Sequence, residues 1–254
     1  LKRLSEFDFP ASYEALEEPN GLLAMGGDLS PERLLRAYSR GIFPWFSSNE
    51  PILWWAPDPR AILLPDEFKV SKSFGKTLKK RGYRVSLNAA FPLVIRACAA
   101  PRASQEGTWI LPAMIDAYTT LHRLGYAHSV EIWSDESLVG GLYGVSIGKA
   151  FFGESMFSSA TDASKTALAT LAYMGRMGYF KFIDCQVESS HLTSLGARLI
   201  RREAFEEQLE NAINDDMEQV RNIIRGVLPE SLNRVPWSDV LPESTTQLYL
   251  GLTQ

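Results

Sequence analysis

The sequence predicts an α+β protein, close to the α/β type, in which helices are interleaved with the strands of one main sheet. Three observations lead to this prediction. Helical and extended patterns alternate after residue 65, residues 138–158 fit a hairpin that turns at Gly148-Lys149, and residues 180–187 form an apolar run typical of a buried strand. A chain of 254 residues is also long enough to bury a sizeable core.

Residues 1–62 are expected to form a small N-terminal domain of short elements and rigid loops. Ser30 is placed to cap a helix that begins at Pro31 and ends at Gly41. Residues 22–29 are interpreted as a turn-rich segment, and residues 41–60 as Trp- and Pro-rich loops whose large rings could stack on a ligand. The composition changes near Pro65, so we assign residues 63–254 to a second domain.

The second domain is expected to hold most of the regular structure. Its predicted elements are a basic helix or turn (66–81), a strand (83–88), helices (90–100 and 111–124), a strand (128–134), hairpin strands (138–147 and 149–158), a helix (162–177), a strand (179–187), a short helix (190–195), a strand (197–202) and a long acidic helix (203–224). Gly178 and Gly196 stand where glycines end helices. The last 25 residues are expected to form an extended tail on the surface.

The composition of the chain indicates in which compartment the protein is found and which cofactors it does not bind. No apolar run approaches the length of a membrane span, and the first ten residues lack the apolar core of a secretory signal. Cys98 and Cys185 have apolar neighbours and are expected to be reduced thiols, and three histidines without clustered spacing predict no zinc site. Neither a P-loop nor a dinucleotide fingerprint occurs. We expect a cytoplasmic protein without membrane contact. We also expect that it does not bind ATP through a P-loop or NAD through a dinucleotide-binding motif.

The net charge of −4 hides a strongly uneven distribution. No acidic residue lies between Glu67 and Glu106, whereas this window holds nine Lys or Arg residues. A basic block in an acidic protein favours a local polyanion site, although a solvated helix face remains the alternative. The proposed phosphate contacts are Lys72, Lys76, Lys79, Lys80, Arg81 and Arg84. The acidic run from residue 203 onward is interpreted as a solvated face.

Three polar residues in apolar strands are the candidate catalytic groups. Asp184 and Gln186 share one face of the 180–187 strand, and Glu154 shares a face with Phe152 and Met156 in the neighbouring hairpin. A buried carboxylate is costly unless it is paired, so either catalysis or a satisfied internal hydrogen bond must explain it. His191 follows the 180–187 strand and is interpreted as a structural partner of a carboxylate rather than as a base. Ser155 and Cys185 are possible nucleophiles, but neither lies in a nucleophile elbow or beside a His-Asp relay, so the catalytic triad of a hydrolase is disfavoured.

Six short motifs resemble the bacterial leucyl/phenylalanyl-tRNA–protein transferase family, in order and over about residues 10–202. They are EPNGLL (18–23), GGDL (26–29), RGIFPWF (40–46), EGTWI (106–110), GESMFS (153–158) and IDCQV (183–187). The resemblance implies transfer of Leu or Phe, and possibly Met, from aminoacyl-tRNA to the N-terminal Arg or Lys of a protein, which marks that protein for degradation. It also implies an acetyltransferase-like (GNAT-type) mixed-sheet domain and no requirement for ATP, CoA or metal. We expect a monomer.

The resemblance also implies roles for individual residues. Trp45 and Trp109, with Tyr118 nearby, would stack on the terminal adenosine of the tRNA. The pocket for the apolar amino-acid side chain would be lined by Leu142, Phe151, Ser155, Leu168 and Leu171. Asp184 and Gln186 would orient the acceptor amine and accept its proton, while Glu154 would favour the cationic acceptor terminus.

Other classes of protein explain fewer of these features. An acetyl-CoA-dependent acetyltransferase would need a pyrophosphate loop between Ser155 and Lys165, and none is found there. A tRNA-dependent transferase acting on cell-wall peptide would not need the N-terminal motifs. A non-enzymatic RNA-binding module accounts for the basic block and the aromatic residues but leaves the three buried polar residues unexplained.

Overall fold

A computed structural model of the chain describes residues 2–4, 8–100, 110–214 and 245–253. It contains two sheets, and the α+β class predicted from the sequence is confirmed. The larger sheet has seven strands in the order β11-β5-β10-β9-β8-β7-β6. All neighbouring strands in it are antiparallel except β9 and β10, which are parallel.

The seven strands of this sheet come from distant parts of the chain. They are β5 (Arg60–Leu63), β6 (Arg84–Leu87), β7 (Ala127–Ser134), β8 (Ser137–Ile147), β9 (Ala150–Ser158), β10 (Phe182–Gln186) and β11 (Arg198–Ile200). The 180–187 segment was expected to be a buried strand, and β10 is an interior strand between β5 and β9. The strand β5 was missed, because residues 51–60 were interpreted as a loop and the predicted domain boundary at residue 62 lies inside this strand.

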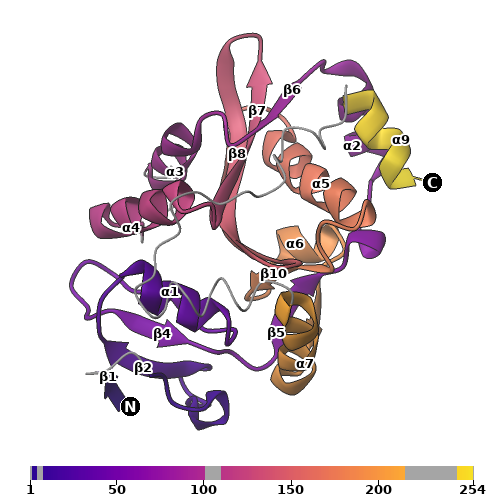
Figure 1. The fold of residues 1–254 in the computed structure, drawn as a ribbon. Helices are drawn as coiled ribbons and strands as arrows, with labels where there is room; N and C mark the ends of the chain where they lie inside the picture. Colours follow the sequence, from indigo (N-terminus) through magenta and orange to yellow (C-terminus); the bar gives the residue numbers. More distant parts are fainter. Residues whose placement is uncertain (1, 5–7, 101–109, 215–244, 254) are drawn as a thin grey trace.

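Helices cover both faces of the large sheet (Figure 1). One face packs on α2 (Lys72–Lys80), α5 (Ala163–Arg176) and α9 (Thr245–Thr253), with Leu142, Phe151 and Ile183 in a shared core. The other face packs on α1 (Pro31–Tyr38), α3 (Phe91–Ala99), α4 (Pro112–Arg123) and α7 (Arg202–Ile213). Phe152 and Phe182 belong to this second core, which continues into the N-terminal region. A short helix, α6 (Ser190–Ser194), follows β10.

The N-terminal region contains a small sheet that the sequence did not predict. Its strands are β1 (Lys2–Leu4), β2 (Leu22–Gly26), β3 (Phe43–Pro44) and β4 (Leu53–Trp55), in the order β1-β2-β4-β3. Glycines and prolines at the ends of these short strands hide their apolar alternation, which explains the error. The helix α1 was predicted well: Ser30 accepts a hydrogen bond from the Arg33 amide, and Pro31 occupies the first turn.

The C-terminal region differs most from the prediction. The helix α7 ends at Ile213, and the rest of the predicted acidic helix lies outside the described residues. The expected extended tail is wrong for residues 245–253, which form α9 and bury Leu248 and Leu252 against α2 and α5. This helix contains no charged residue, so its apolar face can be buried at little cost. In the part of the chain that the structure describes, every helix is too short or too polar to cross a membrane.

Candidate functional site

The candidate site lies where the two parallel strands of the large sheet stop pairing. β9 and β10 are paired from Phe182 opposite Ala150 to Asp184 opposite Phe152. β9 continues to Ser158 and β10 to Gln186, and the ladder of each strand with its other neighbour shifts register at this level. Both strands therefore leave regular geometry at the position of the candidate polar residues, as bulges often do next to active sites.

The irregularity in β9 is a bulge at Glu154. On the neighbouring strand β8, Tyr143 pairs with Ser155 and Gly144 pairs with Gly153, so Glu154 is the extra residue of the bulge. A Cβ at Gly144 would come within 2.2 Å of the Phe152 carbonyl oxygen, so this pairing requires a glycine. The prediction that Glu154 shares a face with Met156 is wrong, because the bulge reverses the alternation and Met156 packs in the core on the α5 side.

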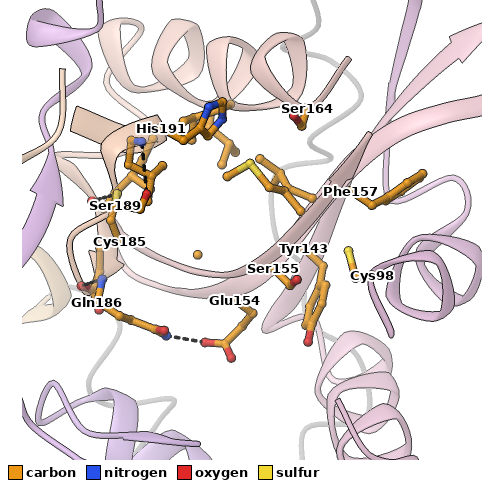
Figure 2. A pocket seen from close by; sticks show the side chains of 18 of the residues that line it. Cys98, Tyr143, Glu154, Ser155, Phe157, Ser164, Cys185, Gln186, Ser189 and His191 are labelled. Atoms are coloured by element: carbon orange, nitrogen blue, oxygen red, sulfur yellow. Dashed lines mark hydrogen bonds between the residues drawn. The ribbon is translucent and has the colours of Figure 1, made fainter. Parts of the chain in front are cut away.

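A cavity of about 1050 Å³ opens beside these two strands. Its apolar part lies on the α5 side of the sheet, and its polar part includes Glu154, Asp184 and Gln186. Figure 2 shows Gln186, Ser189 and His191 on one side of the cavity, Tyr143 and Cys98 on the other, and Glu154 between them. The cavity is large enough for a substrate with both an apolar and a polar part.

Glu154 is buried and is held by three neutral donors. The Tyr38 hydroxyl donates to its Oε1 at 2.7 Å, the Tyr118 hydroxyl to its Oε2 at 2.9 Å, and Gln186 Nε2 to its Oε1 at 3.0 Å. Burial raises the pKa of this carboxyl from 4.5 to about 7, although the three donors act in the opposite direction. Glu154 can therefore change protonation state near neutral pH, which a general acid or base requires.

Asp184 has a different environment, although it is also completely buried. Arg60 of β5 donates from Nε to Oδ1 at 2.8 Å and from Nη2 to Oδ2 at 2.6 Å. The Arg60 guanidinium lies between the rings of Phe43 and Phe205, 4.8 and 4.6 Å from their centroids. Both carboxylate oxygens are thus engaged by a charge-assisted, bidentate ion pair. This arrangement satisfies the carboxylate internally, which was the alternative left open by the sequence.

Gln186 links the two carboxylates. Its backbone amide donates to Asp184 Oδ1 at 2.9 Å, and its side-chain amide donates to Glu154. Its φ of 64° is unusual for a residue other than glycine, and the Asp184 contact helps to hold it. Asp184 and Gln186 were expected on one face of the strand. The ladder with β5 shifts register between them, and both residues line the cavity.

The predicted side-chain pocket residues all line the cavity. They are Leu142, Phe151, Ser155, Leu168 and Leu171. Four of them are apolar and nearly inaccessible, and they belong to the core between the sheet and α5. Ser155 faces the opposite side, beside Tyr143. The apolar part of the cavity therefore comes from β8, β9 and α5.

The predicted stacking residues have different positions. Trp45 lines the cavity, is 46% exposed, and contacts Trp55 at 5.7 Å between centroids. Trp55 Nε1 also donates to the Trp45 carbonyl oxygen, which fixes this loop. Tyr118 is fully buried and does not line the cavity, so its ring offers no free face for stacking; its hydroxyl supports Glu154 instead. Trp109 lies outside the described residues.

The predicted phosphate contacts form an exposed basic surface on and after α2. Lys79 lies 4.0 Å from the centroid of the Tyr249 ring in α9, and the Arg84 guanidinium lies 5.0 Å from that of Trp133. Within the described residues, none of the six cations forms an ion pair with a carboxylate. They are Lys72, Lys76, Lys79, Lys80, Arg81 and Arg84. Thr77 in the same helix donates to Asp162, which lies two residues from the cavity residue Ser164.

Two residues at the site were missed by sequence reasoning. Tyr38 was placed within the helix predicted to begin at Pro31, and Arg60 at the end of the predicted loops. An arginine inside the apolar run 60–63 was the available signal for the second, because such a residue needs a buried counter-charge. Burial raises the pKa of the Cys185 thiol and lowers that of His191, so neither fits a nucleophile–base pair.

Comparison with known proteins gives consistent results. Residues 62–210 match the family described as "Leucyl/phenylalanyl-tRNA protein transferase", and residues 27–58 match its N-terminal domain. The leucyl/phenylalanyl-tRNA–protein transferase of Nitrosomonas eutropha is 59% identical over 218 residues, which cover 85% of this chain and 92% of the relative. That of Cellvibrio japonicus is 59% identical over 202 residues, covering 80% and 86%.

Solved structures resemble the chain only distantly. A GCN5-related N-acetyltransferase-like protein from Streptococcus suis aligns with a TM-score of 0.30 and 11% identity over 65% of this chain and 62% of that chain. The family match covers more than half of the chain, and the two relatives cited are far above the identity at which a family is shared. The chain therefore belongs to the leucyl/phenylalanyl-tRNA protein transferase family.

Proposed function

We propose that this protein transfers Leu or Phe from an aminoacyl-tRNA to the N-terminal Arg or Lys of an acceptor protein. The observation that carries the proposal is the cavity, in which an apolar pocket adjoins a buried carboxylate whose pKa is about 7. The reaction forms a C–N bond and breaks the ester C–O bond. The ester is already activated, so no ATP, CoA or metal is needed.

The apolar end of the cavity would select the transferred amino acid. Leu142, Phe151 and Leu171 present aliphatic and aromatic surface without charge. A Leu, Phe or Met side chain would gain free energy by burial there, whereas a charged side chain would lose its hydration. Because apolar pockets discriminate weakly between similar side chains, the same pocket can accept more than one of the three.

Glu154 and Gln186 would act on the acceptor amine. An α-amine has a pKa of about 7.7–8.0, close to the value of about 7 for Glu154, so proton transfer between them is nearly balanced. The neutral amine attacks the ester carbon and loses a proton to ionised Glu154 as the C–N bond forms. Glu154 then gives this proton to the 3′-oxygen of the tRNA as the ester C–O bond breaks. The Gln186 amide, fixed by its contact with Glu154, would orient the amine.

Asp184 would act as a positioning residue. Its two oxygens already accept hydrogen bonds from Arg60 and from the Gln186 amide. A proton acceptor must be reachable by the amine. Asp184 is completely buried and paired with the charged Arg60, whereas Glu154 is 8% exposed and its donors are neutral. We therefore propose that Glu154 accepts the proton and that Asp184 holds Gln186 in position.

The exposed lysines of α2 would contact phosphates of the tRNA. Such contacts position a nucleic acid without reading its sequence, and they weaken as salt increases. Trp45 is exposed enough to stack on the terminal adenine, with Trp109 as its predicted partner. Charged tRNA is a cytoplasmic substrate, which agrees with the expected location.

The direct test is transfer of labelled Leu from leucyl-tRNA to a peptide that begins with Arg, in the absence of ATP and CoA. We expect labelled peptide that is one Leu residue heavier. The N-acetylated peptide is the matched control, because it retains the Arg side chain but has no free amine. Tight binding of tRNA without labelled peptide would refute the proposal and favour a non-enzymatic RNA-binding module.

A further inference from the structure

Tyr143 of β8 has a buried hydroxyl that makes no hydrogen bond with the described residues. The side chain lines the cavity and is 0% exposed. Its ring is held by edge-to-face contacts with Phe91 and Tyr118, at centroid distances of 5.9 and 5.6 Å. The ring position is therefore fixed by apolar contacts, and the hydroxyl contributes nothing to it.

An unpaired hydroxyl at this place is costly to the free protein. A buried donor without a partner lowers stability, whereas a phenylalanine would make the same ring contacts without this cost. The neighbouring Tyr38 and Tyr118 hydroxyls are both engaged with Glu154, so the free Tyr143 hydroxyl is the exception among the tyrosines at this site. A group that enters the cavity is the natural partner for it.

The position of Tyr143 indicates which part of the substrate it would meet. This step rests on the proposed function, which places the acceptor amine near Gln186 and Glu154. In Figure 2 Tyr143 lies across the cavity from Gln186, with Glu154 between them. The amine approaches the acyl carbon from one face of the ester, and the sugar that carries the leaving oxygen needs a part of the cavity wall that Glu154 and Gln186 do not occupy, which is the Tyr143 side.

We propose that the Tyr143 hydroxyl hydrogen-bonds the ribose 2′-hydroxyl of the terminal adenosine, next to the ester. A phenol and a sugar hydroxyl can each donate and accept, so the pair satisfies both groups. Burial raises the pKa of Tyr143 well above its usual value, which keeps the phenol neutral and able to donate. The contact would hold the ester at a fixed distance from Glu154 and Gln186, and Tyr143 would become a substrate-binding residue of the reaction.

The test is a double-substitution cycle between the protein and the tRNA. Wild type and Tyr143→Phe are each assayed with two leucyl-tRNAs acylated at the 3′-oxygen, one of them 2′-deoxy at the terminal adenosine. We expect kcat/KM to fall about 3- to 10-fold for either change alone, which is the range for one neutral hydrogen bond. The two changes together should cost no more than one of them.

Stability supplies a second, independent readout. Tyr143→Phe should unfold at the same urea concentration as wild type or at a higher one, because it removes an unpaired buried hydroxyl. The control is Tyr83→Phe, whose hydroxyl donates to the Thr161 carbonyl oxygen at 3.0 Å. This variant should lose stability but keep its kcat/KM.

Two results would overturn the inference while leaving the proposed function intact. The first is unchanged kcat/KM of Tyr143→Phe with the natural leucyl-tRNA. The second is a loss for the 2′-deoxy tRNA that is as large in the variant as in wild type, because the hydroxyl would then have another partner. Failure of the wild-type protein to transfer Leu at all would instead refute the proposed function, and this inference with it.

Discussion

Replacement of Glu154 by Gln tests the proposal that Glu154 accepts the amine proton, through its effects on both stability and reaction rate. Burial raises the pKa of Glu154 from 4.5 to about 7. At a pH between these two values, the Glu154 carboxyl is protonated in the folded protein and ionised in the unfolded chain. Between these two pH values the folded state loses stability relative to the unfolded state as pH rises. The difference between 4.5 and about 7 corresponds to about 3 kcal/mol, at about 1.4 kcal/mol per pH unit.

The glutamine introduced by Glu154→Gln would keep one oxygen that accepts from a tyrosine hydroxyl, and its amide nitrogen would meet the other hydroxyl, but it cannot ionise. The difference in unfolding free energy between this variant and wild type should therefore increase in favour of the variant by about 3 kcal/mol from pH 4.5 to pH 8. Urea unfolding of both proteins at several pH values measures this difference, because contributions from all other groups cancel. At the same time the rate of transfer should fall by about 100-fold or more if Glu154 accepts the amine proton.

The two measurements can fail separately. A stability difference that does not change with pH would show that Glu154 has an ordinary pKa, and the proposed proton transfer would lose its basis. A normal pH dependence of stability with nearly normal transfer would show that Glu154 titrates as described but does not take part in the reaction. Only both effects together support its assignment as the proton acceptor.

Four further predictions follow from the contacts of the site and the core. Arg60→Met should lower stability by about 3–5 kcal/mol by leaving Asp184 buried without its cation, and Arg60→Met with Asp184→Leu should recover stability in urea unfolding without recovering transfer. Tyr38→Phe removes a donor to Glu154, so the pKa of Glu154 should rise further and the pH profile of kcat/KM should move to higher pH. Leu142→Phe should reduce the pocket and lower the use of phenylalanyl-tRNA relative to leucyl-tRNA by about 10-fold in competition assays. Leu248→Ala should cost about 2–5 kcal/mol in urea unfolding while transfer by the folded protein is kept, because Leu248 of α9 is fully buried against the α2 and α5 side of the core.

Much of the large sheet could be predicted because its elements are long and periodic. The hairpin of β8 and β9, the helices α3, α4 and α5, and the short helix after Ser189 all lie within a few residues of their expected positions. The strands β2, β4 and β5 were not found, since three to five residues between glycines and prolines carry too little periodicity. The helix α9 was missed because Pro229, Pro236 and Pro242 precede it in the sequence, and prolines favour an extended tail.

The identity of the site residues could be read from the sequence better than their roles. Asp184, Gln186 and Glu154 stood out as polar residues in apolar strands, and all three line the cavity. Their partners could not be found, because Arg60 and Tyr38 are more than 100 residues away along the chain and meet them only through sheet pairing and core packing. Periodicity also cannot detect a bulge, which is why Met156 was placed on the wrong face.

The difference between the two buried carboxylates bears on the proposed preference for an acceptor with a positively charged N-terminus. Asp184 has a fixed positive partner in Arg60, whereas the groups that hydrogen-bond Glu154 are two phenols and an amide, all neutral. An ionised Glu154 is thus stabilised by hydrogen bonds but not by an ion pair, and burial together with the charge of Asp184 raises its pKa. An acceptor with a positively charged N-terminus and an Arg or Lys side chain would bring the opposite charge to this carboxylate. Binding of such an acceptor would favour the ionised form of Glu154 and so prepare the proton acceptor that the reaction needs.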